Sequence, residues 1–333
     1  MDKALDIEQR MISFLEGLSH VTLLDGHIKQ PPNVKIADYL FFDRRAVTEL
    51  KTLKVDPKEK IFGLAASVME SEDFPLIFGD YDLEIAIKSV QGGQAHLDRI
   101  FSKATTMVEE VCRQARDQIA DSKQLLGLDP ETPGILLVLN DTVESIPVSQ
   151  LVDRFSDRLS GSGKNPGRFS HIDFVILIQT TYRLQSSAGK LVPSFIISND
   201  FNAHRHHKVE ADIGRFVESW AHSQGHRYAK PGDIANMQFE LNQPSPPPPQ
   251  SNQDFIEARY RANRYMKGWA EEQLIHHGKD VMQEMLSMVL KGEKRPSETD
   301  SQRYMQQFTE LLEESRLRGF DLKKILNQMP RAK

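Results

Sequence analysis

The N-terminal third of the chain contains three residues, Asp38, Glu49 and Lys51, whose side chains together could bind a metal ion and support catalysis by it. Residues two apart on a strand face the same side of a sheet, so Glu49 and Lys51 point together. Two carboxylates that lie close together repel each other and form a site for a hard divalent cation. The spacing therefore predicts a cation site with a lysine beside it.

Two β-rich runs must position these residues: 34–42 and 46–53. The polar segment 43–45 between them predicts a hairpin. A tight turn about Asp43 and Arg44 places Asp38 opposite Glu49, with Cβ atoms ~5 Å apart. A three-residue turn places Asp38 opposite Leu50 instead, and a bulge is then needed to restore the shared face.

A purely structural role for these charges stays open, because Lys51 could pair with Glu49 or Asp38 on a solvated sheet face. Against that interpretation, Asp38 lies between Ile36 and Leu40 on one face of its strand. A charge on an apolar face is costly to bury unless it is paired or coordinates a metal. A polar cluster in such surroundings favours a site.

Length and composition place the chain among globular proteins of about two domains, at ~150 residues each. Of its 333 residues 39% are hydrophobic and 27% charged, and the net charge of -5 argues against a uniformly basic nucleic-acid coat. The single cysteine, Cys112, excludes an intramolecular disulfide and fits a reducing compartment. No apolar run approaches the ~20 residues that span a bilayer, and the N-terminus has no signal-peptide pattern, so we expect a cytoplasmic protein without membrane contact.

The remaining pattern alternates helices and strands. Helical spacing predicts helices at 3–18, 95–126, 148–159 and 209–224. Strands are expected at 21–24, 134–139, 172–179 and 191–197. The region 56–95 gives no clear pattern, and its acidic part, 70–82, predicts a loop or insertion. The order helix, three strands, helix, strand predicts an α/β fold with a mixed central sheet flanked by helices.

A proline-rich stretch at 243–253 predicts a semi-rigid linker. It separates an α/β domain at 1–242 from an all-α C-terminal domain at 254–333. Helices are expected at 254–290 and 300–328. We expect this helical domain to form a homodimer, bind a partner protein or select substrate.

Asp38, followed about ten residues later by Glu49-Leu50-Lys51 on the next strand, resembles the motif of the PD-(D/E)XK nuclease superfamily. Ala37 stands where that motif usually has proline. The resemblance covers about residues 3–180 and includes the element order, so it implies a restriction-endonuclease-like core. It also implies that Asp38, Glu49 and the Leu50 carbonyl hold Mg²⁺ or Mn²⁺.

Two further residues follow from the resemblance. Many members carry an acidic residue on the first helix, for which Glu8 is the candidate and Glu16 the runner-up. Several carry a glutamine on the helix after the third strand, which Gln118 would supply. The metal would polarise the scissile phosphate and lower the pKa of a bound water, and Lys51 would orient or deprotonate that water.

The resemblance therefore implies a metal-dependent endonuclease that hydrolyses phosphodiester bonds of nucleic acid, with DNA as the expected substrate, in defence or repair. The alternative is a catalytically silent, nuclease-like scaffold that acts through its helical C-terminal domain. Retention of Asp38, Glu49 and Lys51 together disfavours the scaffold. Metal binding separates the two, because a scaffold need not bind Mg²⁺ or Mn²⁺.

Three other patterns have structural interpretations that we favour. His204, His206 and His207 could bind zinc or contact phosphate, but lie in a polar run typical of a solvated loop. The segment 160–168 departs from the phosphate-loop pattern and predicts a surface loop. Basic and aromatic residues alternate over 259–269, which could grip nucleic acid but is more typical of a helix with a core stripe.

Overall fold

The computed structural model describes residues 6–26, 30–32, 34–160, 167–181, 184–186, 189–191, 193–226, 252–290 and 298–329. Its internal contacts divide the chain into two compact units. Unit 1 comprises Met1–Ile61 and Phe101–Gln243. Unit 2 comprises Phe62–Ile100 and Pro244–Lys333. Both units are therefore built from two separate stretches of sequence.

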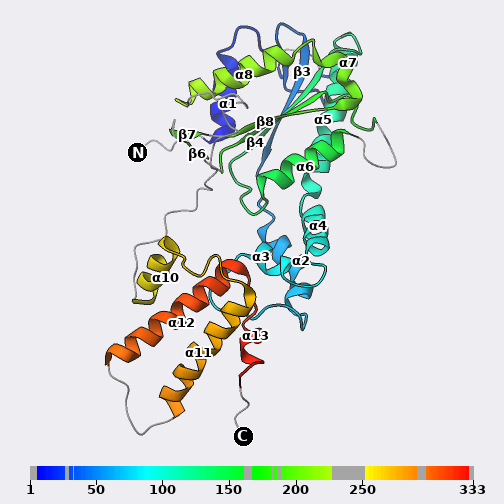
Figure 1. Cartoon of the computed structure of the whole chain (residues 1–333). Coiled ribbons are helices and arrows are strands. Elements are labelled where there is room, and N and C mark those ends of the chain that lie inside the picture. Colours follow the sequence, from blue (N-terminus) through cyan, green and yellow to red (C-terminus); the bar gives the residue numbers. More distant parts are fainter. Residues whose placement is uncertain are drawn as a thin grey trace. The chain divides into compact units, whose positions relative to one another are not determined.

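A six-stranded mixed sheet forms the centre of unit 1 (Figure 1). Its strands, in spatial order, are β1 (Thr22–Leu23), β2 (Tyr39–Phe41), β3 (Ala46–Leu53), β4 (Gly134–Asn140), β5 (Phe174–Gln179) and β8 (Ser194–Ser198). The first three strands are antiparallel, β4 and β5 run parallel to β3, and β8 is antiparallel to β5. Two short strands, β6 (Leu184–Ser186) and β7 (Gly189–Leu191), form a separate hairpin. The predicted α/β class with a mixed sheet is confirmed.

Helices cover both faces of the sheet (Figure 1). On one face α1 (Ile7–Glu16) and α8 (Glu210–Ser223) bury Met11, Phe216 and Trp220 against the strands. On the other lie α5 (Thr106–Leu125) and α6 (Val148–Leu159). Every residue of β4 and β5 is buried, as expected of strands that have helices on both sides.

The β2–β3 hairpin has the register that the tight turn predicts. Tyr39 pairs with Thr48, and continuing this pairing by one residue places Asp38 opposite Glu49. The turn, residues 42–45, contains three consecutive non-glycine residues with φ between 56° and 67°. An even number of turn residues keeps the two carboxylates on one face, so no bulge is needed.

The prediction of a single helix at 95–126 is wrong in one respect. The structure has two helices in this region, α4 (Gly93–Ala104) and α5. Thr105 lies between them with a non-helical ψ of 16°, and its hydroxyl donates to the Phe101 carbonyl at 2.6 Å. Threonine hydroxyls compete with the backbone in this way and weaken a helix. The predicted stop at Gly127 is confirmed, since its φ of 60° is a conformation that glycine adopts without strain.

Unit 2 is helical in its described residues. Its elements are part of α2 (Lys58–Met69), α3 (Leu83–Lys88), part of α4, α10 (Asn252–Ala262), α11 (Glu271–Leu290), α12 (Glu298–Arg318) and α13 (Lys323–Leu326). The segment before α3 is bound to the C-terminal turn: the Leu76 N–H donates to Asp321 at 2.9 Å, and the Leu322 N–H donates to the Leu76 carbonyl at 3.2 Å. Residues 62–100 were expected in the N-terminal domain. Their contacts place them instead in one unit with the C-terminal helices.

The basic and aromatic residues after 258 make internal contacts in unit 2. Glu314 is fully buried, and its carboxylate accepts hydrogen bonds from Tyr260 at 2.6 Å and Arg264 at 3.0 Å. These contacts join α10 to α12, which supports a structural role for the run rather than a nucleic-acid surface. Most of the predicted linker at 243–253 lies outside the described residues. No helix among those described is both long and apolar enough to cross a bilayer.

Candidate metal centre

Four of the predicted site residues come together on the face of the sheet that α5 covers. Asp38 immediately precedes β2, Glu49 and Lys51 lie in β3, and Gln118 lies in α5. The Lys51 ammonium nitrogen is 2.5 Å from Glu49 Oε1 and donates to Gln118 Oε1 at 3.2 Å. The glutamine that the resemblance placed on this helix is therefore in contact with the lysine of the motif.

Asp38 is held by backbone contacts on both sides. Its Oδ2 accepts the Leu50 N–H at 2.8 Å, and its own carbonyl accepts the Leu24 N–H at 2.8 Å. β2 is shorter than predicted, because residues 34–37 are not part of the strand. Polar groups there bond to α5 instead: Gln118 Nε2 donates to the Ile36 carbonyl at 3.0 Å.

Ser122 is a residue at this centre that no sequence pattern indicated. Its hydroxyl oxygen accepts the N–H of Ala37 at 2.7 Å, and both residues are fully buried. The two residues are 85 positions apart, and a lone serine in the last turns of a helix has no distinguishing pattern. Only the packing of α5 on the sheet brings them together.

The two carboxylates of the centre are unusually placed for charged groups. Glu49 has no exposed surface, and neither of its carboxylate oxygens accepts a hydrogen bond of normal geometry from the described residues. Burial, and next the charge of Asp38, raise the pKa of Glu49 to about 7, although Lys51 opposes the shift. Burial also raises the pKa of Asp38, against the lowering effects of the Leu50 N–H and of Lys51.

This donor set fits a hard cation. Mg²⁺ is usually held by one or two carboxylates, with water and substrate phosphate completing its shell. Asp38 and Glu49 supply two carboxylates, and a bound cation would compensate the charge of the buried Glu49 together with the Lys51 ammonium. Among the described residues no group of three or more His, Cys, Asp or Glu side chains is placed to hold a metal. A cation here would therefore depend on this pair and on the Leu50 carbonyl.

The structure does not bring the predicted helix carboxylate to this pair. Glu8 lies in α1, which packs on the opposite face of the sheet, and its carboxylate is 2.7 Å from Lys54 Nζ. Glu16, the runner-up, is exposed in the same helix. Burial, then the charges of Asp38, Glu16 and Glu8, raise the pKa of Tyr39 to about 12, so both glutamates lie near that tyrosine.

The burial of Glu49 predicts a pH-dependent loss of stability in metal-free protein. The pKa of Glu49 is about 7 in the folded protein and near the ordinary 4.5 in the unfolded protein. Between pH 4.5 and pH 7 the Glu49 carboxylate is therefore protonated in the folded protein but not in the unfolded protein. The free energy of unfolding should fall by about 3 kcal/mol as pH rises through this window. Glu49→Gln should abolish that fall and be the more stable protein at pH 8. Urea unfolding with chelator at pH 4 and pH 8 measures both, and equal pH slopes in the two proteins would contradict the prediction.

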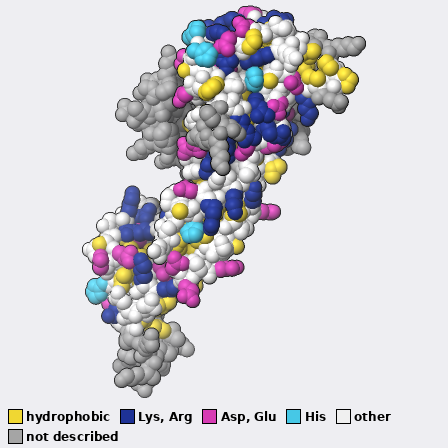
Figure 2. Space-filling model, turned by 90° about the vertical axis from the view of Figure 1, so that its right-hand side faces the viewer, with side chains coloured by type: hydrophobic (Ala, Val, Ile, Leu, Met, Phe, Trp, Pro, Cys, Tyr) yellow, Lys and Arg dark blue, Asp and Glu magenta, His cyan; other side chains and the backbone are white. Residues whose placement is uncertain are grey.

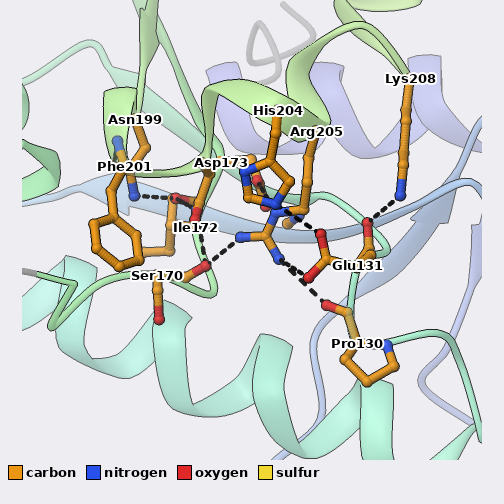
Figure 3. Close-up of polar contacts among 12 residues, drawn as sticks. Pro130, Glu131, Ser170, Ile172, Asp173, Asn199, Phe201, His204, Arg205 and Lys208 are labelled. Atoms are coloured by element: carbon orange, nitrogen blue, oxygen red, sulfur yellow. Dashed lines mark hydrogen bonds and ion pairs between the residues drawn. The ribbon is translucent and has the colours of Figure 1, made fainter.

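A second buried polar cluster lies at the amino ends of β4 and β5 (Figure 3). Arg205 Nε is 2.9 Å from Asp173 Oδ1, and Asp173 Oδ2 accepts the Gly134 N–H at 2.7 Å. Burial raises the pKa of Asp173, which the Gly134 N–H and Arg205 oppose, and burial lowers the pKa of Lys123 to about 8. A Cβ at Gly134 would lie 2.0 Å from the His171 carbonyl oxygen. The cluster is closely packed and joins the two strands, which is a structural role.

The histidine run belongs to the rim of this second cluster. His204 Nε2 is 2.8 Å from Glu131 Oε2, and the ring of His206 lies 4.6 Å from that of Phe174. Both histidines are in the short helix α7 (Ala203–His206). The part of the chain that the structure describes gives them no set of metal ligands, so the zinc alternative gains no support.

Arginines of α5, of α6 and of the segment after α6 are paired with acidic side chains. In Figure 2 several Lys and Arg side chains lie together on the upper part of the molecule, and Asp and Glu side chains lie around them. The arginines concerned and their acidic neighbours are Arg113 with Glu110, Arg116 with Asp117, Arg154 with Asp157, and both Arg158 and Arg168 with Glu109. Such pairing reduces the attraction of this surface for a polyanion.

Fold and centre together define unit 1 as an α/β unit that carries the buried carboxylate of Glu49, the half-buried carboxylate of Asp38 and a lysine on one face of a mixed sheet. Comparison with protein-family models, curated proteins and solved structures finds no match to the chain. Function must therefore be inferred from the centre and from the order of the elements around it.

Proposed function

We propose that this chain is a metal-dependent nuclease that hydrolyses phosphodiester bonds in nucleic acid, with DNA as the expected substrate. The observation that carries the proposal is the arrangement of the buried Glu49, the half-buried Asp38 and Lys51 on one sheet face. The element order gives further support: α1, the antiparallel β1 to β3, and, after the inserted helices α2, α3 and α4, α5 and then β4 parallel to β3. Apart from the three inserted helices, this order resembles that of a restriction-endonuclease-like core.

Asp38 and Glu49, with the Leu50 carbonyl, would hold Mg²⁺ or Mn²⁺. When bound, the metal supplies Lewis-acid polarisation of a phosphate and lowers the pKa of water. The raised pKa of Glu49 means that a proton competes for the metal-binding oxygens near neutral pH. Metal affinity should therefore weaken as pH falls below about 7, and binding should release a proton.

Lys51 and Gln118 have separate roles in this proposal. The Lys51 ammonium lies beside the carboxylates, where it can orient water for in-line attack or neutralise charge on the phosphate in the transition state. Gln118 accepts from that ammonium and donates to the Ile36 carbonyl, so it fixes the direction of the lysine side chain. Asp38 is itself oriented by the Leu50 N–H.

The proposal is tested by assaying the full chain on supercoiled plasmid, linear duplex DNA and single-stranded RNA. Each substrate is incubated with Mg²⁺, Mn²⁺ or chelator, and cation binding is measured in parallel by calorimetry. We expect cleavage of DNA that requires Mg²⁺ or Mn²⁺ and stops with chelator. Cleavage of RNA alone would retain the nuclease and change its substrate.

A Glu49→Gln variant is the control for both measurements. It keeps the size of the side chain but removes one of the two charges that attract the cation, so binding and cleavage should be lost together. If the wild-type protein neither binds a divalent cation nor cleaves any of the three substrates, the nuclease proposal fails. A scaffold that acts through the helices of unit 2 would then be the better interpretation.

A further inference from the structure

We propose that Ser122 is a positioning residue that fixes the backbone ahead of Asp38 and thereby sets the metal affinity of the centre. The inference rests on the proposed function, because it concerns the same carboxylate pair. It adds a residue that acts through Asp38 and does not itself touch the metal.

The contacts that carry the inference come from one side of α5. The Ser122 hydroxyl oxygen accepts the Ala37 N–H at 2.7 Å, and Gln118 donates to the Ile36 carbonyl at 3.0 Å. Gln118 and Ser122 are four positions apart and so are neighbours on one helix face. Two consecutive residues of the segment that leads into Asp38 are thus bound to a single helix.

This support matters because the segment has no strand pairing of its own. Residues 34–37 precede β2, so the sheet does not hold them, whereas Asp38 must stay close to a second negative group. When both are charged and no cation lies between them, Asp38 and Glu49 repel each other, which favours a larger separation of the two carboxylates. Loss of the Ser122 contact leaves a buried N–H without a partner and allows the backbone to move in that direction.

A graded series at this position tests the role. Ser122→Cys keeps the volume of the side chain, but sulfur is a weak acceptor, and Ser122→Ala removes the acceptor. We expect Mn²⁺ to bind about tenfold or more weakly to the alanine variant, as for other groups that orient metal ligands, with the cysteine variant between. Calorimetry with Mn²⁺ alone gives the dissociation constants, and plasmid cleavage gives kcat and KM. Saturating Mn²⁺ should restore most of kcat.

Ser315→Ala is the matched control. Ser315 is also a buried helix serine, 2% exposed, and its hydroxyl donates to the Leu311 carbonyl at 2.8 Å within α12 of unit 2. The Ser315→Ala variant should be less stable than the wild-type protein but should bind Mn²⁺ with wild-type affinity. Wild-type Mn²⁺ affinity in folded Ser122→Ala, or in Ser122→Cys if the alanine variant does not fold, would overturn the positioning role. A wild-type protein that binds no Mn²⁺ would instead overturn the proposed function.

Discussion

Replacing Lys51 with alanine should lower kcat for metal-dependent cleavage by about 10²- to 10⁴-fold, the range for loss of a general acid–base or charge-stabilising group. The ammonium is 2.5 Å from Glu49 and is the one basic group in contact with it among the described residues. KM should change far less, because a substrate polyanion would contact many groups, whereas the proposed function places this lysine at the reacting phosphate alone. The measurement is steady-state cleavage of plasmid with saturating Mg²⁺, which gives kcat and KM for both proteins.

The matched control for this experiment is Lys58→Ala, which removes the same charge from an exposed position at the start of α2. It should leave kcat unchanged. Cation binding by Lys51→Ala should persist, because both carboxylates remain. Cleavage that survives in Lys51→Ala would mean that the activity comes from a contaminant or from another site, and the assignment of this centre would be withdrawn.

Asp173→Ala should destabilise the protein by about 3–5 kcal/mol, the range for removing one partner of a buried ion pair. The side chain has no exposed surface, and that of Arg205 is 6% exposed, so water cannot replace the lost carboxylate. Lys123 is also buried nearby, and its ammonium has no hydrogen-bond partner among the described residues. The variant would leave two buried cations without the group that compensates them.

Urea unfolding at pH 7 measures this effect, with Glu110→Ala as the control. Glu110 pairs with Arg113 at 2.6 Å, but both side chains are about half exposed, so its loss should have little effect on stability. Asp173→Asn keeps an acceptor for the Gly134 N–H but removes the charge, so it should lie between wild type and alanine. Equal stability of Asp173→Ala and Glu110→Ala would show that the cluster does not support the sheet.

The centre was predictable because its geometry is local. Glu49 and Lys51 share a strand, and a hairpin with a four-residue turn brings Asp38 opposite Glu49, so alternation and turn length are enough. The buried apolar runs of β4 and β5 were equally visible, since strands covered on both faces lose the polar alternation. Such features depend on residues within one or two elements.

Features that depend on residues far apart in the chain could not be predicted from the sequence. Ser122 meets a residue 85 positions away, and Asp173 meets one 39 positions away, and neither side chain has a local pattern that reveals its partner. Glu8 was assigned from resemblance, but the face of the sheet on which its helix packs cannot be read from helical spacing. Most of the region 56–95, which gave no clear pattern, belongs to a unit whose other part is the C-terminal third of the chain, so its structure depends on distant residues.

The discontinuous build of unit 2 has a consequence for synthesis on the ribosome. Leu76 bonds to a residue 245 positions later in the chain. At ~5–20 residues per second, about 12–50 s pass between the emergence of the two partners. During that interval the nascent segment 62–100 exposes apolar side chains such as Phe74 and Ile87, which are buried in the finished protein. Some strands of unit 1 are synthesised before this segment and the others after it. Chaperones that bind apolar segments should therefore associate with residues 62–100 while translation proceeds.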